Sequence, residues 1–148
     1  LIFLAGYAAA NLAAFAVVAH LRGRTKLDDY AGLAASRPLI AATLVIALLS
    51  LVGIPPLAGF FGKLSLFITT IAGGYVWLAV LAIANTVVSL FYYLRVIAPM
   101  YFDSPGGRAE VLGRWTAIAT GLGFVTVVAF GLVAGLLFHN FDSARLLP

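Results

Sequence analysis

The sequence has no cysteine and very little charge. The absence of cysteine excludes disulfides, thiolate metal sites and iron–sulfur ligation within this chain. Its two histidines and five carboxylates do not cluster at the spacing of metal ligands, so we expect no metal site either. Only 9% of the 148 residues are charged and 64% are hydrophobic, which excludes an ordinary water-soluble domain. The composition therefore predicts an integral membrane protein.

The start of the sequence also lacks a leader. Leu1 already lies inside an apolar run, with no positively charged region or cleavage site near it. We therefore expect the sequence to belong to a longer protein. The net charge of +4 comes from residues in loops and at helix ends, where membrane topology explains it better than nucleic acid does. The lipid bilayer is the expected surrounding, and no nucleic-acid partner is expected.

Four apolar stretches are long enough to cross a bilayer, which requires about 20 residues of helix. They cover residues 1–21, 38–70, 76–100 and 115–138, with polar loops at 22–37 and 101–114 and a tight turn at 71–75. We therefore predict an all-α integral membrane fold, a single transmembrane region over 1–148 with four helices.

The second stretch contains an interruption. An unbroken helix over 38–70 would be about 50 Å long, well beyond the roughly 30 Å of a bilayer core. Residues 53–63, GIPPLAGFFGK, include two consecutive prolines and three glycines, which disfavour a regular helix. We predict that this helix is broken in mid-membrane near 53–59. Non-helical backbone at that depth must be enclosed by protein or a water-filled cavity, so the break indicates an interior site.

Lysine and arginine gather on one face of the predicted bundle. The loops 22–37 and 101–114 share this face, and the turn at 71–75 and the carboxyl-terminal tail share the other. The basic residues of the first face are Arg22, Arg24, Lys26, Arg37, Arg95, Arg108 and Arg114, against Arg145 alone on the second. The excess predicts that the basic loops are cytoplasmic and that the carboxyl terminus lies on the outer side.

The run SLVGIPPLAGFFGK at 50–63 resembles the broken helix of the antiporter-like membrane subunits of respiratory complex I and of Mrp-type cation/proton antiporters. Two flanking stretches, LDDYAGL at 27–33 and YYLRV at 92–96, are similar to the subunit N branch of bacterial NADH:quinone oxidoreductases. The likeness extends over nearly the whole chain. It implies that the chain matches only the final four helices, about a third, of a 14-helix subunit.

This resemblance implies a non-redox subunit of a proton-translocating NADH:quinone oxidoreductase, multi-pass in a bacterial inner membrane, with no catalysis by this chain alone. Its partners would be the other membrane subunits of complex I. Partner subunits would hold NADH, FMN, iron–sulfur clusters and quinone, and this chain would hold no cofactor. The resemblance further implies that Lys63 is a protonatable station on the way to the outer-side exit. The family's glutamate and other lysines in earlier helices have no counterpart in this sequence.

Physical chemistry supports the role of Lys63. A charged lysine at the bilayer centre costs about 2.5–3.5 kcal/mol, so burial there favours release of its proton. A second half-helix that begins near Phe60 would favour release further through its positive amino end. The alternative is that Lys63 extends to the headgroups and only anchors the helix.

Two further sets of residues accompany this lysine. The expected hinge and close-packed backbone gap comprise Gly53, Pro55, Pro56, Gly59 and Gly62. The candidates for a polar path that holds water are Ser50, Ser65, Asn85, Ser89 and Tyr92. Asn85, Ser89 and Tyr92 share one face of their helix. The alternative is that these polar side chains only form ordinary hydrogen bonds between helices.

Two alternative functions remain open at this point. The first is an Mrp-type cation/proton antiporter subunit, against which the YYLR run argues. The second is a structural or assembly subunit of the membrane in which Lys63 is inert.

Overall fold

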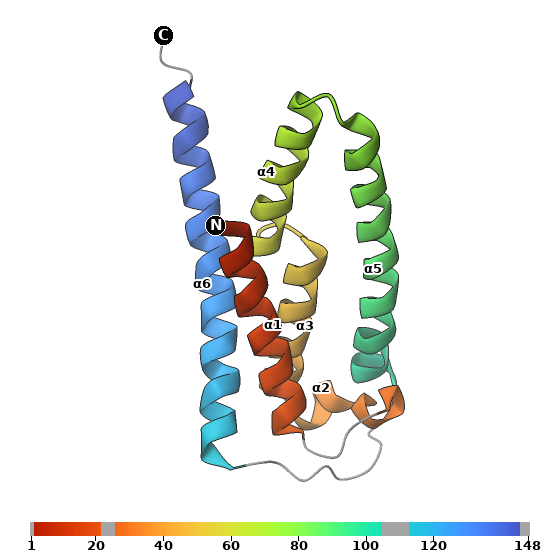
Figure 1. Cartoon of the computed structure of the whole chain (residues 1–148). Helices are drawn as coiled ribbons and strands as arrows, with labels where there is room; N and C mark the ends of the chain where they lie inside the picture. The colour runs from red at the N-terminus through yellow and green to blue at the C-terminus, as the bar shows by residue number, and fades with distance from the viewer. Residues whose placement is uncertain (1, 22–25, 105–112, 146–148) are drawn as a thin grey trace.

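The chain is all-helical, as predicted. A computed structural model describes residues 2–21, 26–104 and 113–145. Within these ranges the elements are α1 (Ile2–His20), the 3-10 helix η1 (Leu27–Tyr30), α2 (Leu33–Ser36), α3 (Pro38–Val52), α4 (Ala58–Ala72), α5 (Val76–Phe102) and α6 (Arg114–Arg145). Figure 1 shows the axes of the long helices roughly aligned, with α1 and α5 running opposite to α3, α4 and α6, and with η1 and α2 across one end of the bundle.

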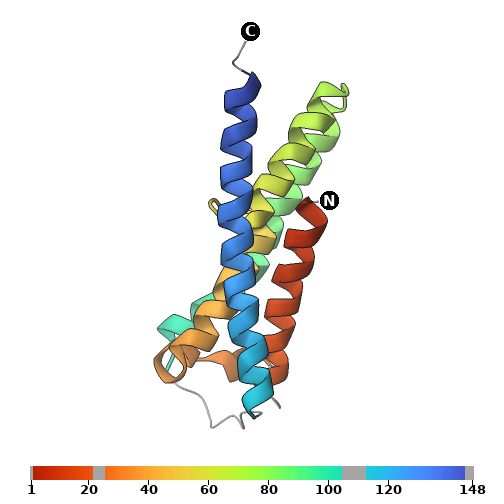
Figure 2. The same ribbon diagram turned by 90° about the vertical axis from the view of Figure 1, so that its left-hand side faces the viewer.

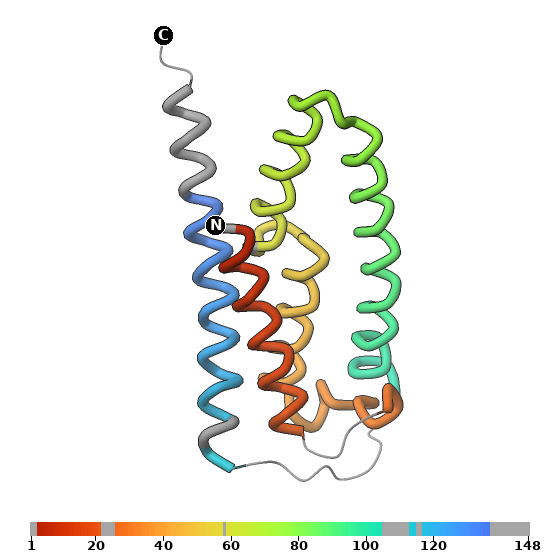
Figure 3. Tube along the Cα trace, viewed as in Figure 1, coloured from red at the N-terminus to blue at the C-terminus, as the bar shows by residue number. Residues whose placement is uncertain are grey.

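Among the residues that the structure describes, three helices are long and apolar enough to cross a membrane. These spans are Phe3–His20, Val76–Phe102 and Ala117–Leu136. The remaining apolar stretch forms two helices of 15 residues each, α3 and α4, in place of one long helix. In the tube view α4 continues upward from the point where α3 ends (Figure 3).

Several helix boundaries differ from the expected ones. The interruption covers 53–57, because Gly59 already lies inside α4. Helix α4 continues to Ala72, which shortens the connection before α5 from the expected residues 71–75 to residues 73–75. Helix α6 continues to Arg145, well beyond the expected end at 138. In α6, backbone hydrogen bonds carry the helix past the apolar stretch into polar sequence. In α4 the added residues, Ile71 and Ala72, are themselves apolar, and the helix ends where Gly73 and Gly74 follow.

The expected loops are also only partly irregular. The loop at 22–37 contains η1 and α2, and residues 22–25 lie outside the described part of the chain. The backbone N–H of Gly32 donates to the carbonyl of Pro99 at 3.0 Å, which attaches this connection to the last turns of α5. Helix α5 extends to Phe102, which takes up the first two residues of the loop expected at 101–114. Residues 105–112 of that loop lie outside the described residues.

Helices α1 and α6 pack against each other and against α3 and α4 (Figures 1 and 2). The contact between α1 and α6 is so close that a Cβ atom built on Gly123 would lie 2.9 Å from the Cα of Ala13. A cluster of small apolar side chains, Ala10, Ala13, Ala47 and Val127, fills the space where α1, α3 and α6 meet. Lipid supplies no hydrophobic driving force between helices, so such close van der Waals contact is what holds them together.

A second apolar cluster lies nearer the end of the bundle where η1 and α2 are found. It joins α1, α3 and α5 with this connection, and its largest fully buried members include Val17, Leu21, Leu33 and Met100. Helix α5 contributes little else to the interior, since Ala79 and Met100 are its only buried residues. The buried side chains of the core therefore lie mainly on α1 and α3.

Two glycines allow the start of α4 to approach its neighbours. A Cβ atom on Gly59 would lie 1.7 Å from the backbone oxygen of Ser50 in α3. A Cβ atom on Gly62 would lie 2.9 Å from the Cα of Phe3 in α1. Any side chain at either position requires the backbones to separate, so the seating of α4 depends on both glycines.

We expect Gly59→Ala to destabilise the assembled protein by about 1–3 kcal/mol, the usual cost of overpacking a tight contact. The added methyl group would overlap a backbone oxygen, which cannot move aside as a flexible side chain can. The melting temperature of the purified protein in detergent should therefore fall.

The matched control is Gly121→Ala in α6, where nothing lies within 4 Å of the added Cβ atom. Alanine favours helix over glycine by up to about 1 kcal/mol, so this variant should melt at or above the parent temperature. Equal melting temperatures for the parent and both variants would contradict the tight contact at Gly59.

Candidate functional site

The site is built on the interruption between α3 and α4. Helix α3 ends with Gly53 in a left-handed conformation, φ 91°, a backbone geometry that glycine adopts at little cost. The Gly53 N–H donates to the carbonyl oxygens of Leu49 at 3.0 Å and Ser50 at 3.1 Å. Pro55 and Pro56, joined by a cis peptide bond, are both exposed. Helix α4 then begins at Ala58.

Lys63 lies in the second turn of α4 and reaches back to the end of α3. Side chains of a helix lean toward its amino terminus, and this inclination directs Lys63 toward the interruption. The Nζ atom donates to the backbone oxygen of Val52 at 2.8 Å. The stem of the lysine passes over Gly53, where an added Cβ atom would lie 3.0 Å from the Lys63 Cδ. Gly53 therefore both ends α3 and leaves room for the lysine.

The Val52 oxygen is an electrostatically suitable partner for an ammonium group. The last four carbonyls of a helix have no partner within that helix, and together they form the negative end of its dipole. The expected effect of the positive amino end of α4 on Lys63 stays a prediction, and the hydrogen bond that the side chain makes is to the carboxyl end of α3. The break thus presents an unpaired acceptor, and Lys63 satisfies it.

A third element completes the surroundings of Lys63. Its Nζ lies 3.4 Å from the Oγ1 of Thr86 in α5, and the Thr86 hydroxyl donates to the Ala82 carbonyl at 3.0 Å. Thr86 was not among the residues expected at the site. A threonine inside an apolar helix usually bonds its own backbone, and Thr86 lies off the helix face that carries Asn85, Ser89 and Tyr92. The only signal available was that α5 contains no other threonine.

The five candidates for a polar path are not brought together. The Ser50 hydroxyl is buried, with no hydrogen-bond partner among the described residues. Ser65 and Ser89 donate to backbone oxygens of their own helices, those of Gly62 and Asn85, both at 2.9 Å. The Asn85 and Tyr92 side chains are exposed on α5. A continuous path through these residues stays a prediction.

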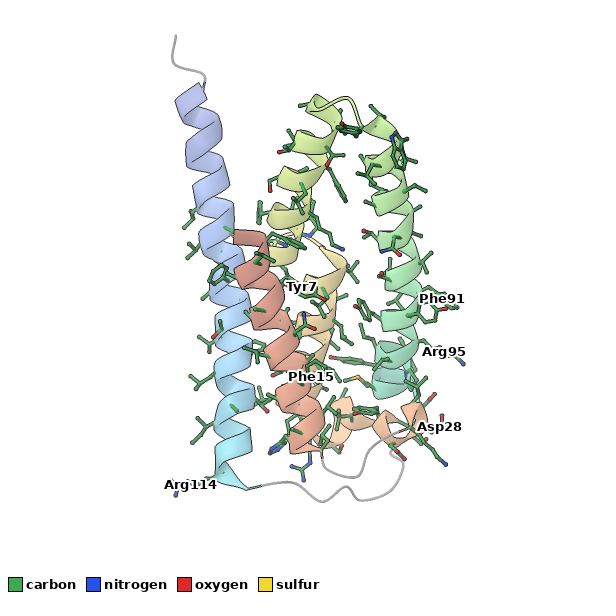
Figure 4. All side chains as sticks on the ribbon, viewed as in Figure 1. Tyr7, Phe15, Asp28, Phe91, Arg95 and Arg114 are labelled. Atoms are coloured by element: carbon green, nitrogen blue, oxygen red, sulfur yellow. The ribbon has the colours of Figure 1, made fainter. Side chains whose placement is uncertain are left out.

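Three charged side chains that Figure 4 labels lie toward one end of the bundle. Asp28, Arg95 and Arg114 all lie toward the end that carries η1 and α2, and Arg95 points away from the other helices. Of the other basic residues counted above, Arg22, Arg24 and Arg108 lie outside the described residues. Across the ranges 2–21, 26–104 and 113–145, no three histidine or acidic side chains gather at a spacing that would hold a metal ion.

Comparison with known proteins identifies the family. A sequence family described as NADH:quinone oxidoreductase/Mrp antiporter, TM, matches residues 1–89. NADH-quinone oxidoreductase subunit N of Mycobacterium sp. (strain JLS) is 45% identical over 138 residues, which cover 91% of this chain and 29% of that protein. Subunit N of Desulfitobacterium hafniense is 47% identical over 114 residues, 75% of this chain and 23% of that protein.

A solved structure agrees with the sequence matches. Respiratory complex I from Thermus thermophilus with bound aureothin contains a chain with a TM-score of 0.80 and 33% identity, over 92% of this chain and 32% of that chain. The protein described here spans about 30% of the length of such relatives. The resemblance to subunit N noted in the sequence is thereby confirmed. The chain belongs to the NADH:quinone oxidoreductase/Mrp antiporter transmembrane family, and within it is similar to subunit N.

Proposed function

We propose that this chain forms part of the membrane arm of a proton-translocating NADH:quinone oxidoreductase, with Lys63 as a protonatable station. The observation that carries the proposal is the hydrogen bond from Lys63 Nζ to the open carbonyl end of α3. A lysine that served only as an anchor would extend toward the headgroups along the lipid-facing side of its helix. Lys63 instead turns toward α3 and α5.

The surroundings of Lys63 suit a group that gains and loses a proton. An isolated charge inside an apolar bundle is costly, which favours the neutral amine. The unpaired carbonyl and the helix dipole act in the opposite direction and favour the ammonium. Because these two effects oppose each other, a small change in the distance between α3 and α4 changes which form is preferred. Such a balance is what a proton-transfer station requires.

The position of Lys63 supports transfer toward the outer side. Nine residues of α4 separate Lys63 from Ala72, which is about 14 Å of helix. The basic end of the bundle lies in the opposite direction, where Asp28, Arg95 and Arg114 are found. By the positive-inside rule that end is cytoplasmic, so α4 leads from Lys63 to the outer surface. In this arrangement the chain crosses a bacterial inner membrane four times, and α3 and α4 together make the second of these crossings.

The partners follow from the relatives. The two curated relatives described above are NADH-quinone oxidoreductase subunits, and the matching solved structure is a respiratory complex I, which favours this assignment over an Mrp-type antiporter. In such a complex other subunits hold NADH, FMN, iron–sulfur clusters and quinone, and this chain is a non-redox subunit. Energy then reaches Lys63 through other membrane subunits, by conformational or electrostatic change.

We expect Lys63→Met to lower NADH-driven proton translocation by about tenfold or more in the intact complex, because methionine keeps the length of the side chain and carries no proton. Lys63→Arg should be equally impaired, because arginine keeps the charge and does not release its proton. Proton uptake by inside-out membrane vesicles measures both, with assembly verified on native gels. An active Lys63→Arg complex would contradict proton exchange and favour a structural cation.

Lys26→Met is the matched control, since Lys26 is the only other lysine of the chain and is exposed. This variant should translocate protons at the parent rate. A loss as large as that of Lys63→Met would show that the effect is not specific to the break.

The proposed orientation predicts which side of the membrane reaches each end of the bundle. These 148 residues contain no cysteine, so Asp28→Cys and Tyr75→Cys each introduce one exposed thiol into this stretch. A membrane-impermeant maleimide should label position 28 only in inside-out vesicles and position 75 only in intact cells or spheroplasts. The label is read on the band of this polypeptide, with the parent as the blank. The reverse pattern would invert the orientation and the direction of the exit.

A further inference from the structure

We propose that Thr86 is a positioning residue for Lys63. The Thr86 hydroxyl contacts the Lys63 amine in both protonation states of the lysine, because it can rotate between two hydrogen bonds. This inference rests on the proposed function of Lys63 and adds to it a residue on a different helix. Its starting point is the pair of contacts that Thr86 Oγ1 makes, 3.4 Å to Lys63 Nζ and 3.0 Å to the Ala82 carbonyl.

As arranged, both contacts of Lys63 are acceptors. The Val52 carbonyl carries no proton, and the Thr86 hydroxyl proton is already donated to Ala82. A lysine ammonium has three N–H donors and no lone pair, so it matches this pair of acceptors. A neutral amine has a lone pair that needs a donor, and neither group supplies one in this arrangement. The observed contacts therefore fit the protonated lysine.

Rotation of the Thr86 hydroxyl removes this mismatch. When the ammonium gives its proton to a water molecule of the path, the amine is left with two N–H groups and one lone pair. The Thr86 O–H can then turn from Ala82 and donate to that lone pair, with no covalent bond to hydrogen broken. The Ala82 carbonyl keeps its ordinary helical partner, the N–H of Thr86, so no backbone group is left unpaired. The deprotonated state thereby gains a hydrogen bond at little cost.

The contact also connects α5 to the break. Few residues of α5 are buried, and Thr86 meets Lys63 at 3.4 Å, near the outer limit of a hydrogen bond. A shift of α5 away from α4 by about 1 Å would therefore end the contact and leave Lys63 held by α3 alone. Thr86 thus makes the surroundings of Lys63 depend on the position of a third helix.

The test replaces the hydroxyl without changing the shape. Thr86→Val is nearly isosteric and should lower the rate of NADH-driven proton translocation by about three- to tenfold in the intact complex, because a hydrogen bond to a charged group is lost. Thr86→Ser keeps the hydroxyl and should restore most of that rate. If the valine variant does not assemble, the translocation rates of Thr86→Ala and Thr86→Ser give the same comparison of a side chain without the hydroxyl and one with it.

Thr70→Val is the matched control. Its hydroxyl also donates to a backbone oxygen four residues earlier, that of Leu66 at 2.7 Å, and no contact with Lys63 is found among the described residues. It should translocate protons at the parent rate. A loss as large as that of Thr86→Val would indicate a general effect of removing such hydroxyls and would overturn the inference.

The outcomes separate this inference from the function on which it rests. If Lys63→Met is inactive and Thr86→Val is fully active, Lys63 remains the station and the role of Thr86 is wrong. If Thr86→Ser is as impaired as Thr86→Val, keeping the hydroxyl does not restore the rate, and the positioning role assigned to that hydroxyl is overturned. If Lys63→Met translocates protons at the parent rate, the proposed function fails first, and the positioning role fails with it.

Discussion

The hydrogen bond between Lys63 and the Val52 carbonyl resolves the main difficulty of this fold, an apolar helix that stops in the middle of its course. A helix that ends away from water leaves carbonyl groups without partners, and each such group is costly in a membrane. At the end of α3, Gly53 satisfies part of this demand through its own N–H, and the lysine satisfies the Val52 carbonyl. The charge and the break therefore stabilise each other, and neither is well accommodated alone.

The packing of the other helices follows from the need to hold these two ends together. Gly59 brings the first turn of α4 against the Ser50 backbone, and Gly62 brings it against α1. Small residues such as Ala13 and Gly123 join α1 to α6, so that the pair supports α3 and α4 from one side. Helix α5, with few buried residues, covers the other side at Thr86. The break is thus held firmly on one side and loosely on the other.

Most of the fold could be predicted from the sequence, because composition and length constrain a membrane protein strongly. The double proline, the three glycines and the excess length of residues 38–70 located the interruption to within two residues of its observed end. The ends of α4 and α6 could not be located in this way. Helix α6 continues past its apolar segment because its backbone hydrogen bonds can still form, and α4 continues through Ile71 and Ala72 to the glycine pair. The turn expected at 71–75 and the expected carboxyl-terminal tail are therefore longer than the observed ones.

The candidate site could be predicted only in part. Lys63 was identifiable because a lysine in an apolar segment is rare and costly. The direction of its side chain was not identifiable, because it depends on how α4 is placed relative to α3. Thr86 was missed for the same reason, since being the one threonine of α5 does not mark it as a partner of Lys63 until α4 lies beside it. Asn85 and Tyr92, which the polar pattern favoured, are exposed in this part of the structure.

The central claim is that the lysine closes the broken helix. An experimental density map of the intact membrane complex, resolved well enough to place the lysine head group, tests it most directly. The account predicts Nζ of Lys63 within hydrogen-bond distance of the Val52 carbonyl, with the stem lying over Gly53. A lysine side chain extended along α4 toward the lipid headgroups, with the Val52 carbonyl bound to another group, would contradict it.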